Sequence, residues 1–141
     1  MSTIKRFEDL ECWQQAREFV KYIYGLTKKD GFQKDQRLVN QVRGSAVSSM
    51  ANISEGFHRN SNREFMKFLD YSRSSIAETI SHCYVAMDQG YILEAEMKNV
   101  NDQANILWKK VNNLISYLNN FPNGTKKVTE NNARSRTNKT N

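Results

Sequence analysis

The sequence contains very little proline and glycine: one proline and six glycines in 141 residues. Folds with many turns need these residues at their turns, whereas both residues interrupt long helices. The scarcity therefore argues against a turn-rich β fold and favours long helices. The length suits one domain with a tail, and about 120 residues can bury roughly two thirds of their unfolded surface, enough for one core.

The sequence also has few cysteines and no long apolar run. Cys12 and Cys83 are too few and too far apart for a disulfide framework or a zinc knuckle, so we expect both to be reduced and packed. No stretch reaches the roughly 20 apolar residues that cross a bilayer, and the first residues lack the apolar segment of a signal peptide. We therefore expect a cytoplasmic protein with no membrane partner.

The net charge of +6 is unevenly distributed along the chain. Residues 1–120 contain 16 Lys and Arg against 14 Asp and Glu, a net charge of +2, whereas residues 121–141 contain five against one, a net charge of +4. Any basic surface on the body must therefore come from local arrangement. The last residues are too polar to offset their ordering entropy, so we predict a folded domain over 1–121 and a disordered basic tail over 122–141.

Apolar residues recur every three or four positions in four segments, which is the spacing of one helix face. Similar lengths and short connections favour an all-α, antiparallel up-down-up-down four-helix bundle. The last segment alternates spacings of three and four, the repeat of a left-handed bundle seam. Its predicted seam is Met97, Val100, Ala104, Leu107, Val111, Leu114, Leu118 and Phe121. The four predicted helices cover residues 9–29, 35–55, 61–90 and 97–121.

Capping signals mark the ends of these helices. Asp9 and Asp35 suit N-caps, and Ser61 with Glu64 has the spacing of a capping box. Glycine after a helix can adopt the left-handed conformation that ends it. The expected stops are Gly31, Gly56 and Gly90.

No group of residues has the pattern of a reaction centre. His58 and His82 are the only histidines, and His82 and its neighbour Cys83 point about 100° apart on a helix, so they form neither a metal clamp nor a nucleophile–base pair. Carboxylate pairs such as Glu94 and Glu96 fall near helix starts, where negative charge is favourable. We predict no catalytic residue, no metal and no cofactor, and hence not an enzyme.

Basic residues gather around the connection between the second and third predicted helices. Arg59, Arg63 and Lys67 are spaced by four, and Arg37 and Arg43 lie on the preceding helix, an arrangement that allows a face that holds phosphates. The alternative is a solvated turn whose cations pair with nearby carboxylates such as Glu64 and Asp70. The candidate nucleic-acid-binding residues are Arg37, Arg43, Arg59, Arg63 and Lys67.

Small polar residues form a matching stripe on the same two helices. The stripe is too polar for a core, and ordinary solvated faces carry more Lys and Glu. Because small residues permit close approach of helices, a wet subunit interface is one interpretation and simple exposure is the other. The candidate interface residues are Ser45, Ser48, Asn52, Tyr71, Ser75 and Glu78.

Two segments resemble a known family. Phe7-Glu8-Asp9-Leu10-Glu11-Cys12-Trp13 is similar to the F-x-D-L-x-x-W opening of the four-helix-bundle family encoded in bacterial 23S rRNA intervening sequences. Asn52-Ile53-Ser54-Glu55-Gly56, with Arg59, Ser61, Glu64-Phe65 and Phe68-Leu69, resembles that family's N-I-A-E-G-x-x-R-x-S-x-x-E-F-x-x-F-L signature. Arg73-Ser74-Ser75 is similar to its following R-G-S, and Met50 stands where a proline is common, which suggests a straighter helix.

The resemblance implies a bundle assembled into a ring, typically a homopentamer. Related members accompany diversity-generating retroelements, where a basic surface binds the reverse transcriptase and nucleic acid; Arg59 and Arg63 are the candidates for that surface here. We therefore predict a non-enzymatic homo-oligomeric accessory protein that associates with RNA or DNA, or with a nucleic-acid enzyme. The alternative is a protein–protein interaction scaffold with no nucleic-acid role.

Overall fold

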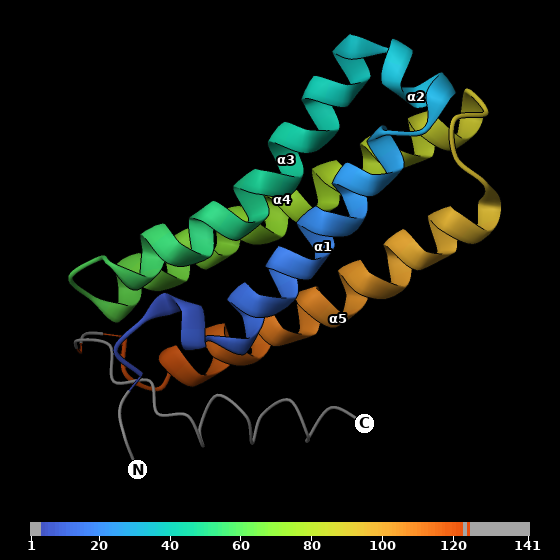
Figure 1. Ribbon diagram of the computed structural model, residues 1–141. Coiled ribbons are helices and arrows are strands. Elements are labelled where there is room, and N and C mark those ends of the chain that lie inside the picture. Colours follow the sequence, from blue (N-terminus) through green and yellow to red (C-terminus); the bar gives the residue numbers. More distant parts are fainter. Residues whose placement is uncertain (1–3, 123, 125–141) are drawn as a thin grey trace.

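The protein folds into a bundle of four long helices (Figure 1). The computed structural model describes residues 4–122 and 124, and over these residues every regular element is helical. The predicted tail lies outside the described residues except for Pro122 and Gly124. A 3₁₀ turn, η1 (Phe7–Asp9), precedes α1 (Glu11–Thr27), α2 (Asp30–Lys34), α3 (Gln36–Phe57), α4 (Asn62–Asp88) and α5 (Glu94–Leu118).

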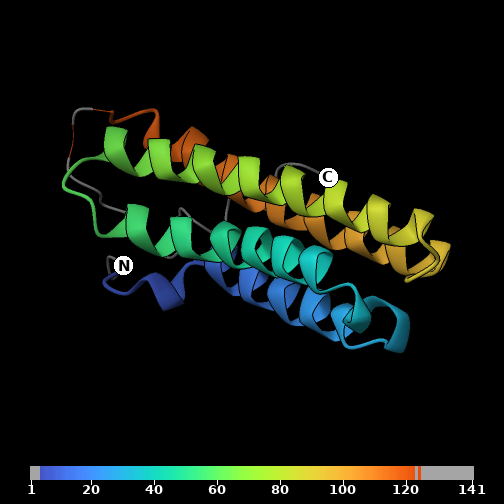
Figure 2. The same ribbon diagram turned by 90° about the horizontal axis from the view of Figure 1, so that it is seen from above.

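The long helices follow the predicted up-down-up-down order. Helix α3 packs against α1 and α4, and α5 packs against α4 and α1, so the bundle closes as a ring of four neighbours. Figure 2 shows α1 beside α3 and α4 beside α5. The most extensive pairing joins α3 and α4. None of the helices in the described part of the chain is long and apolar enough to cross a membrane.

The regular seam predicted for the last helix is confirmed, with one exception. Its first seven residues, from Met97 to Leu118, are all buried. Phe121 is 57 % exposed, so its place in the seam was predicted wrongly. The physical reason is that α5 ends at Leu118 and the following turn, in which Phe121 N–H donates to the Leu118 carbonyl at 2.9 Å, breaks the periodicity.

The segment around Gly31 differs from the prediction. Gly31 does not stop a helix: it lies inside α2, and Gly90, at φ 76°, is the glycine that adopts a left-handed conformation among the described residues. Burial of Phe32, which stacks on Tyr91 with ring centroids 5.5 Å apart, folds this segment back onto the bundle. The helix-end preference of one glycine is outweighed by the burial of a large aromatic ring.

Helix starts agree with the sequence at α3 and α4. The Leu38 N–H donates to Asp35 Oδ1 at 3.1 Å, and the Glu64 N–H donates to Ser61 Oγ at 3.2 Å. Asp9 is not a cap, because it belongs to η1, and buried Leu10 precedes α1 instead. Packing of Leu10 in the core therefore fixes the entry into α1.

Gly56 lies within α3 rather than ending it. A Cβ added at Gly56 would lie 2.8 Å from Phe68 Cβ and 2.9 Å from Phe65 Cδ1, both on α4. The absence of a side chain is therefore what lets α3 and α4 approach at this point.

Gly56→Ala should lower the free energy of unfolding by about 1–3 kcal/mol, because the added methyl group overpacks this contact. Gly44, on the same helix, has no atom within 4 Å of an added Cβ. As the matched control, Gly44→Ala should stabilise the protein by about 0.5–1 kcal/mol through helix propensity. Urea unfolding of both variants tests this; equal effects of the two substitutions would contradict it.

Glu96 links the start of α5 to α1 at the opposite end of the bundle. Its Oε1 accepts from the Leu93 N–H at 2.9 Å and from Lys29 Nζ, and the Tyr22 hydroxyl donates to its carbonyl at 3.3 Å. Partial burial raises the pKa of Glu96. The hydrogen bonds from Lys29 and Leu93 and the positive charge of Lys29 lower this pKa by more, so it lies below its usual range.

A lowered folded pKa means that the ionised Glu96 carboxylate stabilises the protein above its unfolded pKa of about 4.3 and that this contribution is lost as the pH falls. Glu96→Gln should therefore lower the free energy of unfolding by about 0.5–1 kcal/mol near neutral pH. The difference from the unmodified chain should shrink as the pH falls below about 4.3 and should vanish once the pH lies below the lowered pKa of Glu96 in the folded protein. Urea midpoints measured across this pH range provide the test; a difference that persisted in acid would contradict the assignment.

Candidate nucleic-acid interface and helical face

One end of the bundle gathers segments that are far apart in the sequence. The connection between α3 and α4 lies there with the N-terminal turn and the end of α5 (Figure 1). The rings of Phe7 and His58 approach edge to face at 5.9 Å, and Asn62 Nδ2 donates to the Phe121 carbonyl at 2.9 Å. We call this the hairpin end.

Three of the predicted basic residues lie at the hairpin end. Arg59, Arg63 and Lys67 are all exposed, on the connection and the first turns of α4. The Arg59 guanidinium lies 4.4 Å from the centroid of the Phe68 ring, a cation–π contact that limits its side-chain freedom. We call these three residues the hairpin cations.

Asp70, one of the carboxylates that the solvated-turn interpretation pairs with the cations, is bonded to Arg73. Asp70 Oδ1 accepts from Arg73 Nη2 at 2.6 Å, and Arg73 also donates to Asn112 Oδ1 at 2.9 Å. These bonds tie Asp70 to the α4–α5 side of the bundle. Arg73, rather than Lys67, is therefore the cation that pairs with Asp70.

The other two predicted basic residues do not join the hairpin cations. Arg37 lies at the start of α3, and the 22 positions to Arg59 correspond to about 33 Å along a helix. Arg43 is half-buried: its Nε donates to Thr27 Oγ1 at 2.9 Å, and its guanidinium lies 4.5 Å from the centroid of the Tyr24 ring. The five residues therefore do not form one patch, because α3 separates Arg37 from the hairpin and Arg43 braces α1 against α3.

A hollow of about 330 Å³ opens beside Arg59. The rings of Phe7 and His58 line it together with the polar side chains of Ser54 and Glu55. No pattern in the sequence predicts this hollow, because Phe7 and His58 meet only when the N-terminal turn folds against the α3–α4 connection. The sequence marks Phe68 only as part of the family signature and does not predict that Arg59 lies over its ring.

The predicted interface residues divide into an outer group and one inner residue. Ser48, Asn52, Tyr71, Ser75 and Glu78 are exposed or partly exposed along the outer side of the α3–α4 pair. We call these five residues the α3–α4 face. Tyr71 is 43 % exposed, whereas Ser45 is only 5 % exposed.

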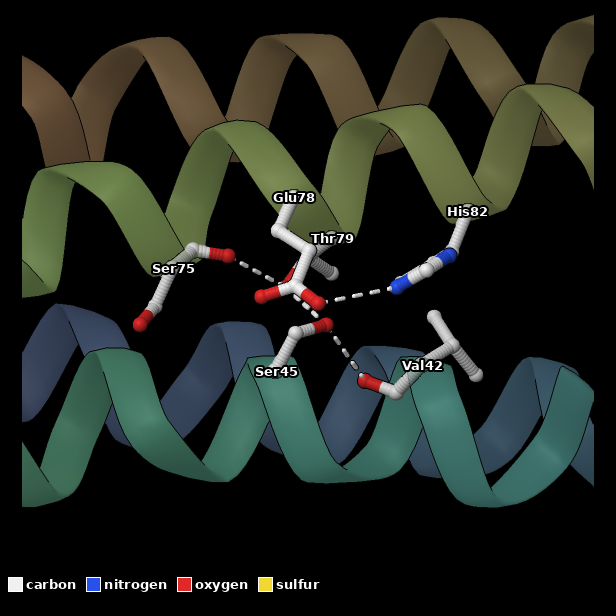
Figure 3. A network of polar contacts seen from close by, with 6 residues as sticks. All are labelled: Val42, Ser45, Ser75, Glu78, Thr79 and His82. Carbon is white, nitrogen blue, oxygen red and sulfur yellow. Dashed lines mark hydrogen bonds and ion pairs between the residues drawn. The ribbon is translucent and has the colours of Figure 1, made fainter.

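Ser45 is buried between α3 and α4, where it takes part in a polar network (Figure 3). Thr79 Oγ1 donates to Ser45 Oγ at 2.8 Å, and Ser45 donates to the Val42 carbonyl at 3.1 Å. On the outer side of the same network, His82 Nε2 lies 3.3 Å from Glu78 Oε1. Because its hydroxyl is used within the chain, Ser45 does not belong to a surface that another molecule can contact.

The histidine, cysteine and carboxylate side chains of the described residues do not gather into a metal site. Within the described ranges, no three His, Cys, Asp or Glu side chains are placed to hold a metal ion. Cys12 and Cys83 are buried as predicted, and burial raises the pKa of each thiol to about 12. Both thiols therefore stay protonated near neutral pH and are poor nucleophiles.

The fold and the hairpin end define a small, all-helical protein built on an antiparallel four-helix bundle. Over residues 8–113 its sequence matches the family described as 23S rRNA-intervening sequence protein, and the chain belongs to that family. This confirms the family resemblance carried by the opening segment and the α3–α4 signature.

A solved structure supports the same fold. It is a protein of unknown function from the S23 ribosomal protein family of Bacteroides thetaiotaomicron, with a TM-score of 0.68 and 23 % sequence identity. The alignment covers 74 % of this chain and 97 % of that one. No curated protein matches the sequence significantly. At this identity the likeness concerns the fold alone.

Proposed function

We propose that the protein is a cytoplasmic, non-enzymatic, homo-oligomeric accessory factor that binds RNA or DNA, alone or in a ribonucleoprotein, through the hairpin end. The observation that carries the proposal is the grouping of Arg59, Arg63 and Lys67 on the connection and the first turns of α4. Membership in the 23S rRNA-intervening sequence protein family is consistent with an RNA-associated role.

The chemistry of the hairpin cations suits a phosphate backbone. Arginine presents a planar fork of donors to phosphate oxygens, and lysine adds a mobile point charge. Arg63 and Lys67 are one helical turn apart, so their side chains rise from the same side of α4. The rings of Phe7 and His58, which line the hollow beside Arg59, add surfaces on which an unpaired base can stack.

The charge balance sets the expected strength of binding. Residues 1–120 carry a net charge of only +2, so the attraction exerted by this part of the chain comes from the local grouping of the hairpin cations. Three phosphate contacts on a single strand give a slope of about −2 in log K against log salt. Binding should therefore be sequence-tolerant, weak at physiological salt and measurable at low salt.

Arg63→Gln with Lys67→Gln should weaken binding to single-stranded RNA and reduce the salt slope by about 1.4, because two phosphate contacts are lost. Lys28→Gln with Lys34→Gln removes the same charge at the opposite end and is the matched control. The control pair should leave the slope unchanged. A gel-shift salt titration measures both variants. Absence of binding by the unmodified chain at about 50 mM salt would remove the proposal.

We further propose that the α3–α4 face is the contact between copies of the chain. Four of its five members carry short or aromatic side chains that can be ordered at little entropic cost, and Tyr71 adds the kind of amphipathic ring that interfaces favour. Val47 is 40 % exposed on α3 and adds apolar surface to this helix. A ring of subunits, pentameric by family resemblance, would repeat the hairpin cations around one side.

Ser48→Arg should dissociate the assembly, because it adds a long charged side chain at the centre of the proposed contact. Asn105→Arg adds the same side chain at an exposed position of α5 and should leave the assembly intact. Light scattering at micromolar concentration measures the mass of each variant. A monomeric unmodified chain would contradict the oligomer. An assembly that never binds RNA would favour a protein-interaction scaffold instead.

A further inference from the structure

The hollow beside Arg59 contains a negative charge that phosphate binding does not use. Glu55 lines this hollow from the last turn of α3, and its side chain is exposed. Within the described part of the chain, its carboxylate forms neither a hydrogen bond nor an ion pair. A carboxylate near a helix C-terminus faces the negative end of the helix dipole, and one beside phosphate-binding cations repels a nucleic-acid backbone. Glu55 therefore stabilises neither α3 nor a bound phosphate.

The other side chains around the hollow suit a flat aromatic ligand. The rings of Phe7 and His58 meet at an interplanar angle of 79°, so they offer aromatic surface in two directions. Ser54 Oγ donates to the Ala51 carbonyl at 2.8 Å, so its proton is used within α3. The hollow, of about 330 Å³, lies at the lower end of the roughly 300–1,000 Å³ of ligand pockets. It thus combines rings for stacking with one carboxylate that can accept hydrogen bonds.

Guanine is the nucleobase whose hydrogen-bonding edge matches a carboxylate. Its N1–H and N2–H₂ are neighbouring donors, which the two carboxylate oxygens can accept together. Adenine and cytosine present one donor group beside a ring nitrogen that accepts, and uracil presents one N–H between two carbonyl oxygens. Each of these bases therefore places a lone pair against the carboxylate. A guanine in a single strand exposes the matching edge.

We propose that the hollow holds one unpaired guanine of the bound strand, with Glu55 accepting from N1–H and N2–H₂ and with the rings of Phe7 and His58 against the base. This inference rests on the proposed function and adds one base-specific contact to it. Arg59 borders the hollow, and Arg63 and Lys67 follow on the first turns of α4, so the hairpin cations are available to the flanking phosphates. Phosphate contacts hold the strand without reading its sequence, whereas Glu55 reads one position.

Fluorescence anisotropy with a set of labelled RNAs tests the guanine contact. Each RNA has about 12 nucleotides, all uridine except one central position that holds guanine, adenine, cytosine or uracil. At about 50 mM salt the unmodified chain should bind the guanine RNA about fivefold or more tighter than the others, because a bidentate contact discriminates to this degree.

Glu55→Gln should reduce the preference for guanine to less than about twofold, because an amide offers one acceptor oxygen in place of two. The same change removes a negative charge, so the affinity for the all-uridine RNA should not fall. Glu64→Gln removes the same charge from an exposed position at the hairpin end that does not line the hollow, and as the matched control it should keep the preference. A preference that survives Glu55→Gln would overturn the site.

His58→Ala tests the stacking contact. It should weaken binding of the guanine RNA about fivefold, the effect of losing one ring under a base. An RNA that lacks the central base should lose less than about twofold, because its phosphate contacts are unchanged. Equal losses for the two RNAs would contradict stacking in the hollow.

The outcomes separate this inference from the proposed function. If the unmodified chain bound all the RNAs equally, the guanine site would be overturned and the proposed function would stand. If it bound none of them at about 50 mM salt, both would fail. Guanosine 5′-monophosphate should compete only weakly, because it lacks the flanking phosphates. Its displacing the guanine RNA at equal concentration would overturn a strand as the source of the base.

Discussion

The close packing of α3 against α4 is the constraint on which the rest of the structure depends. Gly56 lies against Phe65 and Phe68 with no room for a Cβ. Farther along the pair, Ser72 Oγ donates to the Ser49 carbonyl at 2.6 Å and Thr79 meets Ser45 at 2.8 Å. Buried hydroxyl groups need partners, so a shift of one residue along the pair would leave them unsatisfied. These contacts fix the register of the two helices.

That register determines what the pair presents to solvent. At one end it brings Arg59 onto Phe68 and exposes Arg63 and Lys67. Along the outer side it leaves the small polar residues of the α3–α4 face exposed. At the same end, Asn62, the first residue of α4, donates a hydrogen bond to the carbonyl of Phe121, which follows α5. The proposed binding end and the proposed subunit contact are thus two consequences of one helix pairing.

The sequence predicted the features that depend on local spacing. The α5 seam, the caps at Asp35 and Ser61 and the order of the long helices follow from patterns within a few turns of chain. Helix α2 was missed because it forms when Phe32 meets Tyr91, a contact between distant segments. Helix length alone could have separated Arg37 from Arg59, since 22 positions span about 33 Å.

Other features of the candidate sites required the register of α3 and α4. Ser45 and Ser48 are similar residues less than one turn apart, and only the position of α4 shows that the first is buried and the second exposed. Gly56 carried the signal of a helix stop, although its function is close packing. Asn62 gave no signal in the sequence, because its partners at the end of α5 are distant in the chain.

The central claim is that the pairing of α3 with α4 creates an RNA-binding end. Hydrogen–deuterium exchange of the full chain, with and without single-stranded RNA, tests this claim most directly. The register of α3 and α4 predicts that RNA protects backbone amides around residues 57–71 and leaves those of α2 unchanged. Protection centred on α2 and the start of α3, with none at the α3–α4 connection, would contradict the account.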